Sequence, residues 1–243
     1  MLERDMHRIV FTFKVAMTVQ TLALIAGFMV VSTSSAQAGC RDYPVPGVDW
    51  TKCRKRNVIL SDIDLSNARM KYIDLVGTDL RNTRLVSADL SRAMLSRTNF
   101  GRSDLTNANL MKVEGTRCSF AGAKLVGTNF SKASMFRTNF SGADLTSSNF
   151  NKTEMGRANF KGANLTDVTF QFSNIARADF KGAILKNVDF RNAWLYRVRF
   201  FGVDLSSVKN LGQEQIGLAC GDMKTILPAG IVKPANWPCM KDG

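Results

Sequence analysis

The chain has 243 residues, of which 45% are hydrophobic, and this is enough for one domain with a substantial core. Its 33 Lys and Arg residues outnumber its 20 Asp and Glu residues, so the formal net charge is +13 at pH 7. This balance excludes an acidic surface overall and favours anionic partners such as nucleic acid, phosphorylated lipid or acidic glycan, but it says nothing about the fold.

Residues 1–38 are predicted to be a signal peptide. A basic start precedes an apolar run over residues 15–31, and Ala36 and Ala38 place small residues where a signal peptidase cleaves. Cleavage after Ala38 would make the chain periplasmic or secreted. Two alternatives stay open. The apolar run is close to the length of a membrane anchor, and Cys40 could be lipidated, although the residue three places before it is not aliphatic.

Residues 39–57 are predicted to form an N-terminal cap. The segment is rich in turn-forming residues, carries Trp50, and is bracketed by Cys40 and Cys53. Export places these cysteines in an oxidising compartment, so we predict a disulfide that pins the cap.

Residues 58–210 repeat every five positions. A large apolar residue stands at each multiple of five from 60 to 205 except at Gly115, and the residue two places earlier is always small or β-branched. A period of five fits neither a helix nor a strand. It fits a chain that turns a corner every five residues and points two side chains per unit into a shared interior. Cys118 stands at a small position, so we predict a buried thiol there.

The repeated unit, as in Ala88-Asp89-Leu90 and Ala158-Asn159-Phe160, resembles that of the pentapeptide-repeat family. The resemblance implies an all-β fold, a right-handed quadrilateral β-helix with four pentapeptides per coil and short caps at both ends. Its coils would stack like strands, about 4.8 Å apart.

The sequence itself supports four units per coil, because residues 20 positions apart share character. Stacked phenylalanine rings are therefore expected in two columns on opposite sides of the interior. The first column holds Phe100, Phe120, Phe140, Phe160, Phe180 and Phe200, and the second holds Phe130, Phe150, Phe170 and Phe190.

Residues 211–243 are predicted to form a C-terminal cap, since a solenoid must cover its exposed edge. A short helix is expected over 211–216, with Ile216 and Leu218 as its packing face. Cys220 and Cys239 bracket the following segment, so we predict a second disulfide. A zinc site is the alternative, but the cysteine spacings do not fit the usual paired-ligand motifs. Both ends look like those of other exported bacterial pentapeptide-repeat proteins.

No catalytic group can be assembled from the sequence. The single histidine, His7, lies in the predicted signal peptide, so the commonest general base and metal ligand are missing from the rest of the chain. Acidic residues stand mostly at the outward position of the repeat, where solvation explains them. We therefore predict no enzymatic activity, no cofactor and no metal.

Two basic columns are the outward feature that suggests binding. In six consecutive coils the last residue of one unit is an arginine, and the unit before it ends in a basic or aromatic residue, as at Tyr72 and Arg92. The two columns are expected to flank one face that also carries Phe136. Charges in rows suit phosphates or carboxylates, and exposed rings suit sugars or bases. The candidate binding residues are Arg97, Arg117, Arg137, Arg157, Arg177, Arg197, Lys112, Lys132, Lys152, Phe172, Trp194 and Tyr196.

An ordinary solvated surface is the competing interpretation of these columns. Duplication of a coil would copy an arginine without selection for binding. In addition, Glu114, Glu154 and Asp179 are close enough in the repeat to pair with the nearest arginine. Against this, like charges on neighbouring strands are destabilising, and three acids only partly offset six arginines.

We expect a non-enzymatic binding or scaffold protein of the cell envelope. The best-known activity of the family, mimicry of DNA that blocks topoisomerases, depends on an acidic surface and a cytosolic location, so a basic exported chain argues against it. An anionic polymer, an anionic membrane surface and nucleic acid stay open as ligands. The alternative is a rigid spacer or assembly partner that contacts another protein, or a second copy through Phe172, Trp194, Tyr196 and Phe201.

Overall fold

The computed structural model describes residues 39–239. The predicted signal peptide and the alternative membrane anchor lie outside the described residues. Between residues 39 and 239, no helix is long and apolar enough to cross a bilayer. Cys40 is disulfide-bonded to Cys53, and this bond uses the sulfur atom to which a lipid would be attached.

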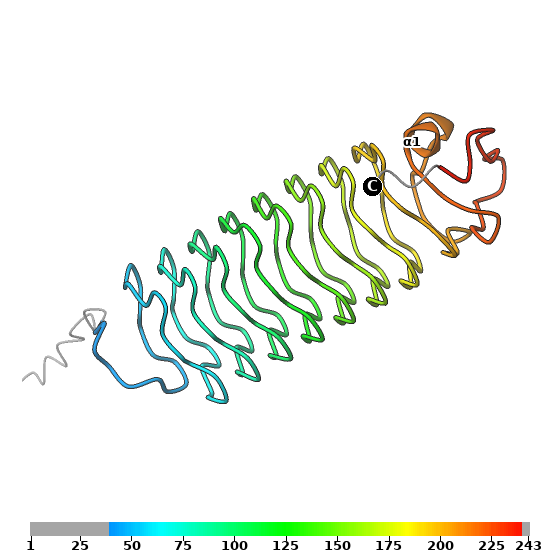
Figure 1. Cartoon of the computed structure of the whole chain (residues 1–243). Helices are drawn as coiled ribbons and strands as arrows, with labels where there is room; N and C mark the ends of the chain where they lie inside the picture. Colours follow the sequence, from blue (N-terminus) through cyan, green and yellow to red (C-terminus); the bar gives the residue numbers. More distant parts are fainter. Residues whose placement is uncertain (1–38, 240–243) are drawn as a thin grey trace, which may run out of the picture. The chain divides into compact units, whose positions relative to one another are not determined.

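The chain winds into a four-sided coil with a period of 20 residues. One residue in every five pairs in parallel with the residue 20 positions later, from Asp49 with Arg69 to Asp179 with Arg199. Four pentapeptides therefore complete one coil, and the coils stack along a common axis (Figure 1). The predicted all-β, right-handed quadrilateral β-helix is confirmed. Pairing begins at Asp49, within the segment 39–57 that we predicted as a cap.

The hydrogen bonds of one unit explain the polar residue of the repeat. In the unit around Leu65, the N–H groups of Leu65 and Asn67 donate to carbonyls of the next coil, and that of Ala68 closes a turn on the carbonyl of Leu65. The N–H of Ser66 has no such acceptor and donates instead to Oδ1 of Asp64 at 2.8 Å. Asp or Asn thus recurs before the large apolar residue because its short side chain satisfies a donor that the coil leaves over.

The two phenylalanine columns fill the interior as predicted. Rings in one column stack, with centroids 4.7 Å apart and planes at 4° for Phe100 and Phe120. Rings of opposite columns meet edge to face, with centroids 5.7 Å apart at 88° for Phe120 and Phe130. All these side chains are fully buried. Offset-stacked and edge-to-face pairs are the two favoured arrangements of aromatic rings, so the core gains more than burial alone.

Cys118 is the buried thiol that we predicted, and it occupies the space beside Gly115. A Cβ atom at position 115 would lie 2.6 Å from Sγ of Cys118. The same sulfur lies 2.8 Å from the carbonyl oxygen of Leu95. Thr98 uses its hydroxyl in the same way, donating to the carbonyl of Leu75 at 2.8 Å. Small polar side chains at this position therefore satisfy main-chain carbonyls inside the coil.

Both predicted disulfides are present, Cys40–Cys53 at the N-terminal end and Cys220–Cys239 at the C-terminal end. All four of these sulfurs are therefore bonded in pairs. The zinc alternative for these cysteines is wrong.

The C-terminal cap contains one short helix, α1 (Gln213–Leu218) (Figure 1). Ile216 is fully buried as predicted, but Leu218 is exposed, so half of the predicted packing face is wrong. The carbonyl of Leu218 instead accepts the N–H of Arg197, which fixes this residue at the edge of the last coil. The side-chain amide of Gln215 donates to two carbonyls of that coil, those of Phe190 and Ala193.

Coil pairing resumes after the helix, with Cys220 on Arg199 and Ile226 on Asp204. Trp237 then packs over this edge, and its Nε1 donates to the carbonyl of Ala219 at 2.9 Å. Trp237 therefore covers the apolar interior of the last coil with its ring and satisfies a main-chain carbonyl of the same edge with its N–H group.

Replacement of one core ring tests the stacked columns. Phe140→Ala removes a ring that contacts four others, with centroids 5.1–5.8 Å away. We expect the free energy of unfolding to fall by about 3–5 kcal/mol in urea denaturation. Phe172→Ala is the matched control, because Phe172 is 53% exposed at a corner, and it should change stability by less than about 1 kcal/mol. Equal losses in the two variants would contradict the stacked core.

Candidate binding face

The last residue of each pentapeptide turns a corner with a left-handed backbone, and the corners form four columns along the stack. Left-handed backbone disfavours most residues, and Gly, Asn and Asp adopt it most readily. Two columns mostly follow this rule, with Arg102, Ser87 and Ser147 as exceptions. One holds Asp62, Asn82, Arg102, Gly122, Gly142, Gly162, Gly182 and Gly202, and the other holds Asn67, Ser87, Asn107, Gly127, Ser147, Asp167 and Asn187.

The other two corner columns break the rule. Most of their residues are cations or aromatics with φ values between 55° and 61°, and for these the left-handed backbone costs about 1–2 kcal/mol each. Between Lys52 and Asn192 at its ends, the first holds Tyr72, Arg92, Lys112, Lys132, Lys152 and Phe172, and after Asn57 and Gly77 the second holds Arg97, Arg117, Arg137, Arg157, Arg177 and Arg197. The structure thus brings ten of the twelve predicted binding residues together as the two borders of one side of the coil, and the other two, Trp194 and Tyr196, lie between these borders.

We define the basic-aromatic face as these two columns with the strip of outward side chains between them. The strip contains Met94, Ser96, Glu114, Thr116, Ser134, Phe136, Glu154, Gly156, Asn174, Ala176, Trp194 and Tyr196. The apolar exposure of the coil is concentrated here. Of seven exposed large hydrophobic side chains between residues 60 and 210, this face carries all but Ile184, namely Tyr72, Met94, Phe136, Phe172, Trp194 and Tyr196.

Five arginines of the second corner column are not neutralised by acids among the described residues. Within residues 39–239, no ion pair of 4.0 Å or less involves Arg97, Arg117, Arg137, Arg157 or Arg177. Asp179 pairs instead with Lys161 at 3.3 Å and with Arg199 at 2.6 Å, both on the neighbouring side. Glu114 and Glu154 likewise form no ion pair in the described part of the chain. The suggested pairing of these three acids with the nearest arginines is therefore wrong, and the solvated-surface interpretation stays a prediction that this pairing does not support.

Several of these cations lie over aromatic rings. The guanidinium of Arg137 is 5.5 Å from the centroid of Phe136, and the ammonium of Lys152 is 5.9 Å from that of Phe172. Arg197 lies 5.5 Å from the centroid of Tyr196. Such contacts attract a cation without cancelling its charge. The face therefore keeps its positive charge and holds it in place.

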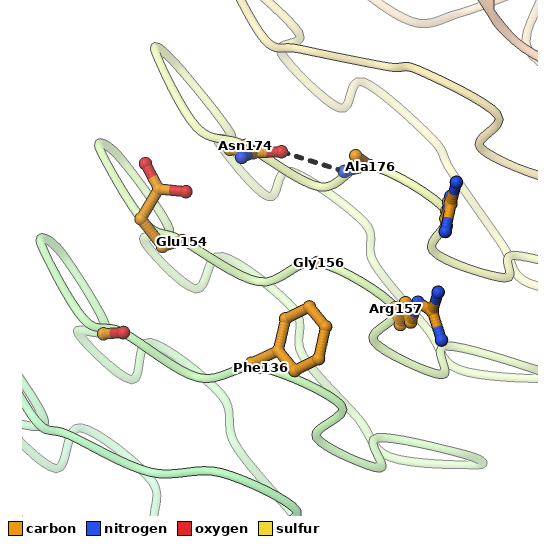
Figure 2. A pocket seen from close by; sticks show the side chains of 8 residues that line it. Phe136, Glu154, Gly156, Arg157, Asn174 and Ala176 are labelled. Atoms are coloured by element: carbon orange, nitrogen blue, oxygen red, sulfur yellow. Dashed lines mark hydrogen bonds between the residues drawn. The ribbon is translucent and has the colours of Figure 1, made fainter.

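The face is hollowed where two small residues follow each other along the strip. Figure 2 shows Phe136, Glu154 and Arg157 around Gly156, with Asn174 and Ala176 in the next coil. The ring of Phe136 lies against Gly156, since a Cβ there would be 2.9 Å from the ring. The hollow has a volume of about 350 Å³ and is lined by Ser134, Phe136, Glu154, Gly156, Arg157, Asn174, Ala176 and Arg177.

Main-chain donors are left open in this hollow. In four consecutive coils the strip carries Met94, Glu114, Ser134 and Glu154 where the other sides mostly have Asp or Asn. As a result, the N–H groups of Phe136 and Gly156 find no acceptor among the described residues. Asn174 restores the usual bond, and its Oδ1 accepts the N–H of Ala176 at 3.1 Å (Figure 2).

Sequence reasoning missed both the hollow and its donors. The signal that could have found them is the interruption of the Asp/Asn pattern in four consecutive coils, at positions 94, 114, 134 and 154.

The comparisons with known proteins agree with this architecture. The profile of the Pentapeptide repeats matches eight copies in segments 56–85, 73–111, 116–151, 148–182 and 163–202. A search of curated proteins found no match.

Three solved structures of pentapeptide repeat or resistance proteins match this chain. A trypsin-treated variant of QnrB1, a plasmid-mediated fluoroquinolone resistance protein, is 16% identical with a TM-score of 0.55, covering 75% of this chain and 86% of its own. HetL, a pentapeptide repeat protein involved in heterocyst differentiation regulation from the cyanobacterium Nostoc sp. strain PCC 7120, is 24% identical with a TM-score of 0.32, covering 81% and 89%. A thylakoid-lumen pentapeptide repeat protein from Arabidopsis thaliana is 26% identical with a TM-score of 0.25, covering 62% and 82%. The similarity to the QnrB1 variant supports the fold of this chain and nothing further.

Thiol reactivity tests whether the one free thiol in residues 39–239 is available for chemistry. Burial raises the pKa of Cys118 to about 12, so its thiolate is scarce at neutral pH. We expect no alkylation by iodoacetamide at pH 8 in the native protein and one alkylated thiol after denaturation without reductant. Rapid alkylation of the native protein at this residue would contradict the buried position.

Proposed function

This chain belongs to the pentapeptide-repeat family, and we propose that it is a non-enzymatic binding protein of the cell envelope whose basic-aromatic face holds an anionic partner. One observation carries the proposal. Five arginines recur in consecutive coils, exposed and without an acid partner in residues 39–239, at corners where Gly or Asn is the ordinary residue, namely Arg97, Arg117, Arg137, Arg157 and Arg177.

The energetics of the corners favour a ligand over an incidental surface. Neighbouring coils are about 4.8 Å apart, and two unit charges at about 4 Å repel by roughly 1 kcal/mol even in water. The left-handed backbone adds its own destabilisation at each corner. Duplication of a coil would account for the repetition of an arginine, but it does not offset either term. An anion bound along the column would offset the repulsion.

The envelope location is part of the proposal. The predicted signal peptide supports it, and so do the disulfides at both ends of the fold, because such bonds persist in oxidising compartments. Mimicry of DNA needs an acidic surface, and the charge of this face has the opposite sign.

A protein-assembly role is the second candidate, and one observation favours it. Near the C-terminal end of the face, the rings of Trp194 and Tyr196 stack with centroids 6.3 Å apart, and Trp194 is 51% exposed. Exposed aromatic clusters of this kind are typical of protein contacts. A rigid spacer that docks on another envelope protein would use this cluster rather than the arginine column.

Retention on dextran sulfate across a salt gradient separates the two candidates. We expect the purified protein to bind at low salt, and Arg137→Glu with Arg157→Glu to elute at clearly lower salt, because a polyanion site weakens as charges are lost.

The control carries Lys124→Glu and Lys186→Glu, which make the same change of net charge on the opposite side of the coil. It should elute near the unmodified protein. If all three proteins elute together, the arginine column is not a binding site, and the aromatic cluster becomes the place to look for a partner.

A further inference from the structure

We propose that the ligand of the basic-aromatic face is an acidic polysaccharide that lies lengthwise along the stack with one sugar per coil. The inference rests on the proposed function and names the class of its ligand. It comes from one juxtaposition, a row of unpaired polar side chains that runs between two rows of cations.

The middle of the face is suited to neutral hydroxyl groups. Glu114, Ser134 and Glu154 stand in consecutive coils, all exposed. Among the described residues, their side chains make no hydrogen bond or ion pair. Carboxylates accept hydrogen bonds strongly from hydroxyl donors. A sugar chain offers such hydroxyls at every unit.

The charge pattern favours a glycan over the other polyanions. A nucleic acid strand or a plane of lipid headgroups would bring phosphates onto Glu114 and Glu154 as well as onto the cations, and like charges at such distances repel. A polysaccharide with carboxylate substituents separates the two kinds of group. Its carboxylates reach the arginine column, and its hydroxyls face the glutamates.

The hollow supplies the remaining contacts for one sugar ring. The ring of Phe136 is 42% exposed and offers an apolar surface to the C–H groups of a sugar. The N–H groups of Phe136 and Gly156 occupy positions that elsewhere donate to an outward Asp or Asn, so they are directed outward and can donate to sugar oxygens. Arg157 and Arg177 line the same hollow, and each guanidinium can bind a carboxylate through two parallel hydrogen bonds.

The repeat distance agrees with this orientation. Coils stack about 4.8 Å apart, which is close to the length of one pyranose unit in an extended chain. A polymer with one carboxylate per sugar therefore carries its charges at a spacing close to that of the coils. A duplex nucleic acid strand carries one phosphate per about 3.4 Å of axis, and it falls out of step within a few coils.

Removal of the Glu154 carboxylate should change the affinity for an acidic polysaccharide in opposite directions, depending on whether this group accepts hydrogen bonds from sugar hydroxyls or only repels the anion. We would measure the affinity for polygalacturonate by isothermal titration calorimetry in the purified protein and in Glu154→Ala. If the carboxylate accepts sugar hydroxyls, the variant should bind at least fivefold more weakly. If the face attracts anions by charge alone, loss of an acid should leave binding unchanged or make it tighter. Glu154→Gln keeps an acceptor and should recover part of the affinity.

Glu214→Ala is the matched control, because Glu214 is an exposed acid on α1 that does not line the hollow. It makes the same change of charge and should not weaken binding. Circular dichroism of each variant would establish that the fold is intact. The same titrations with oligo(dT) and with phosphatidylglycerol vesicles compare the other anions, and both should bind more weakly than polygalacturonate.

The outcomes separate this inference from the proposed function. Polygalacturonate binding that is unchanged or tighter in Glu154→Ala overturns the glycan, and so does tighter binding of oligo(dT) or vesicles. The proposed function of the basic-aromatic face is still supported after either result if Arg137→Glu with Arg157→Glu loses retention on dextran sulfate. If the double variant is retained on dextran sulfate like the unmodified protein, and Glu154→Ala binds polygalacturonate with unchanged affinity, both the glycan ligand and the proposed function of the basic-aromatic face are wrong.

Discussion

Each coil of this protein closes because the chain turns four corners, and each corner has two requirements. The residue at the corner must accept a left-handed backbone, and the main-chain N–H just before it must find an acceptor. Three sides meet the second requirement mostly with Asp or Asn, and two corner columns meet the first mostly with Gly, Asn, Asp or Ser. The stacked phenylalanines then fill the interior that these turns enclose.

The basic-aromatic face is the side on which both requirements are relaxed. Its corners carry Arg and Lys in place of Gly or Asn, and its strip carries Glu and Ser where an Asp or Asn would close the turn. Each departure raises the energy of the folded chain slightly and leaves a charge, a carboxylate or an N–H group facing outward. Local rules of this kind are most often broken where a protein binds something.

The sequence predicted the interior and the ends well because both depend on periodic or paired residues. Burial of two side chains every five residues sets the coil, so the phenylalanine columns, the buried Cys118 and the two disulfides followed from spacing. The surface was harder to predict. Whether Asp179 pairs with Arg177 or with Arg199 depends on which side of a corner each side chain takes, and the exposure of Leu218 depends on where a six-residue helix ends. The hollow exists because the ring of Phe136 turns onto Gly156, and the five-residue pattern of the sequence does not predict the rotation of a side chain.

The stability of corner variants tests the central claim most directly, that the arginines are retained for a ligand and not for the fold. Arg137→Asn with Arg157→Asn places at these corners the residue that Asn57, Asn82 and Asn107 already provide elsewhere at positive φ. We predict that the free energy of unfolding in urea, with disulfides intact, rises by roughly 0.5–1 kcal/mol per corner while affinity for the anionic ligand falls. A loss of stability in this variant would make the arginines structural and would contradict the account.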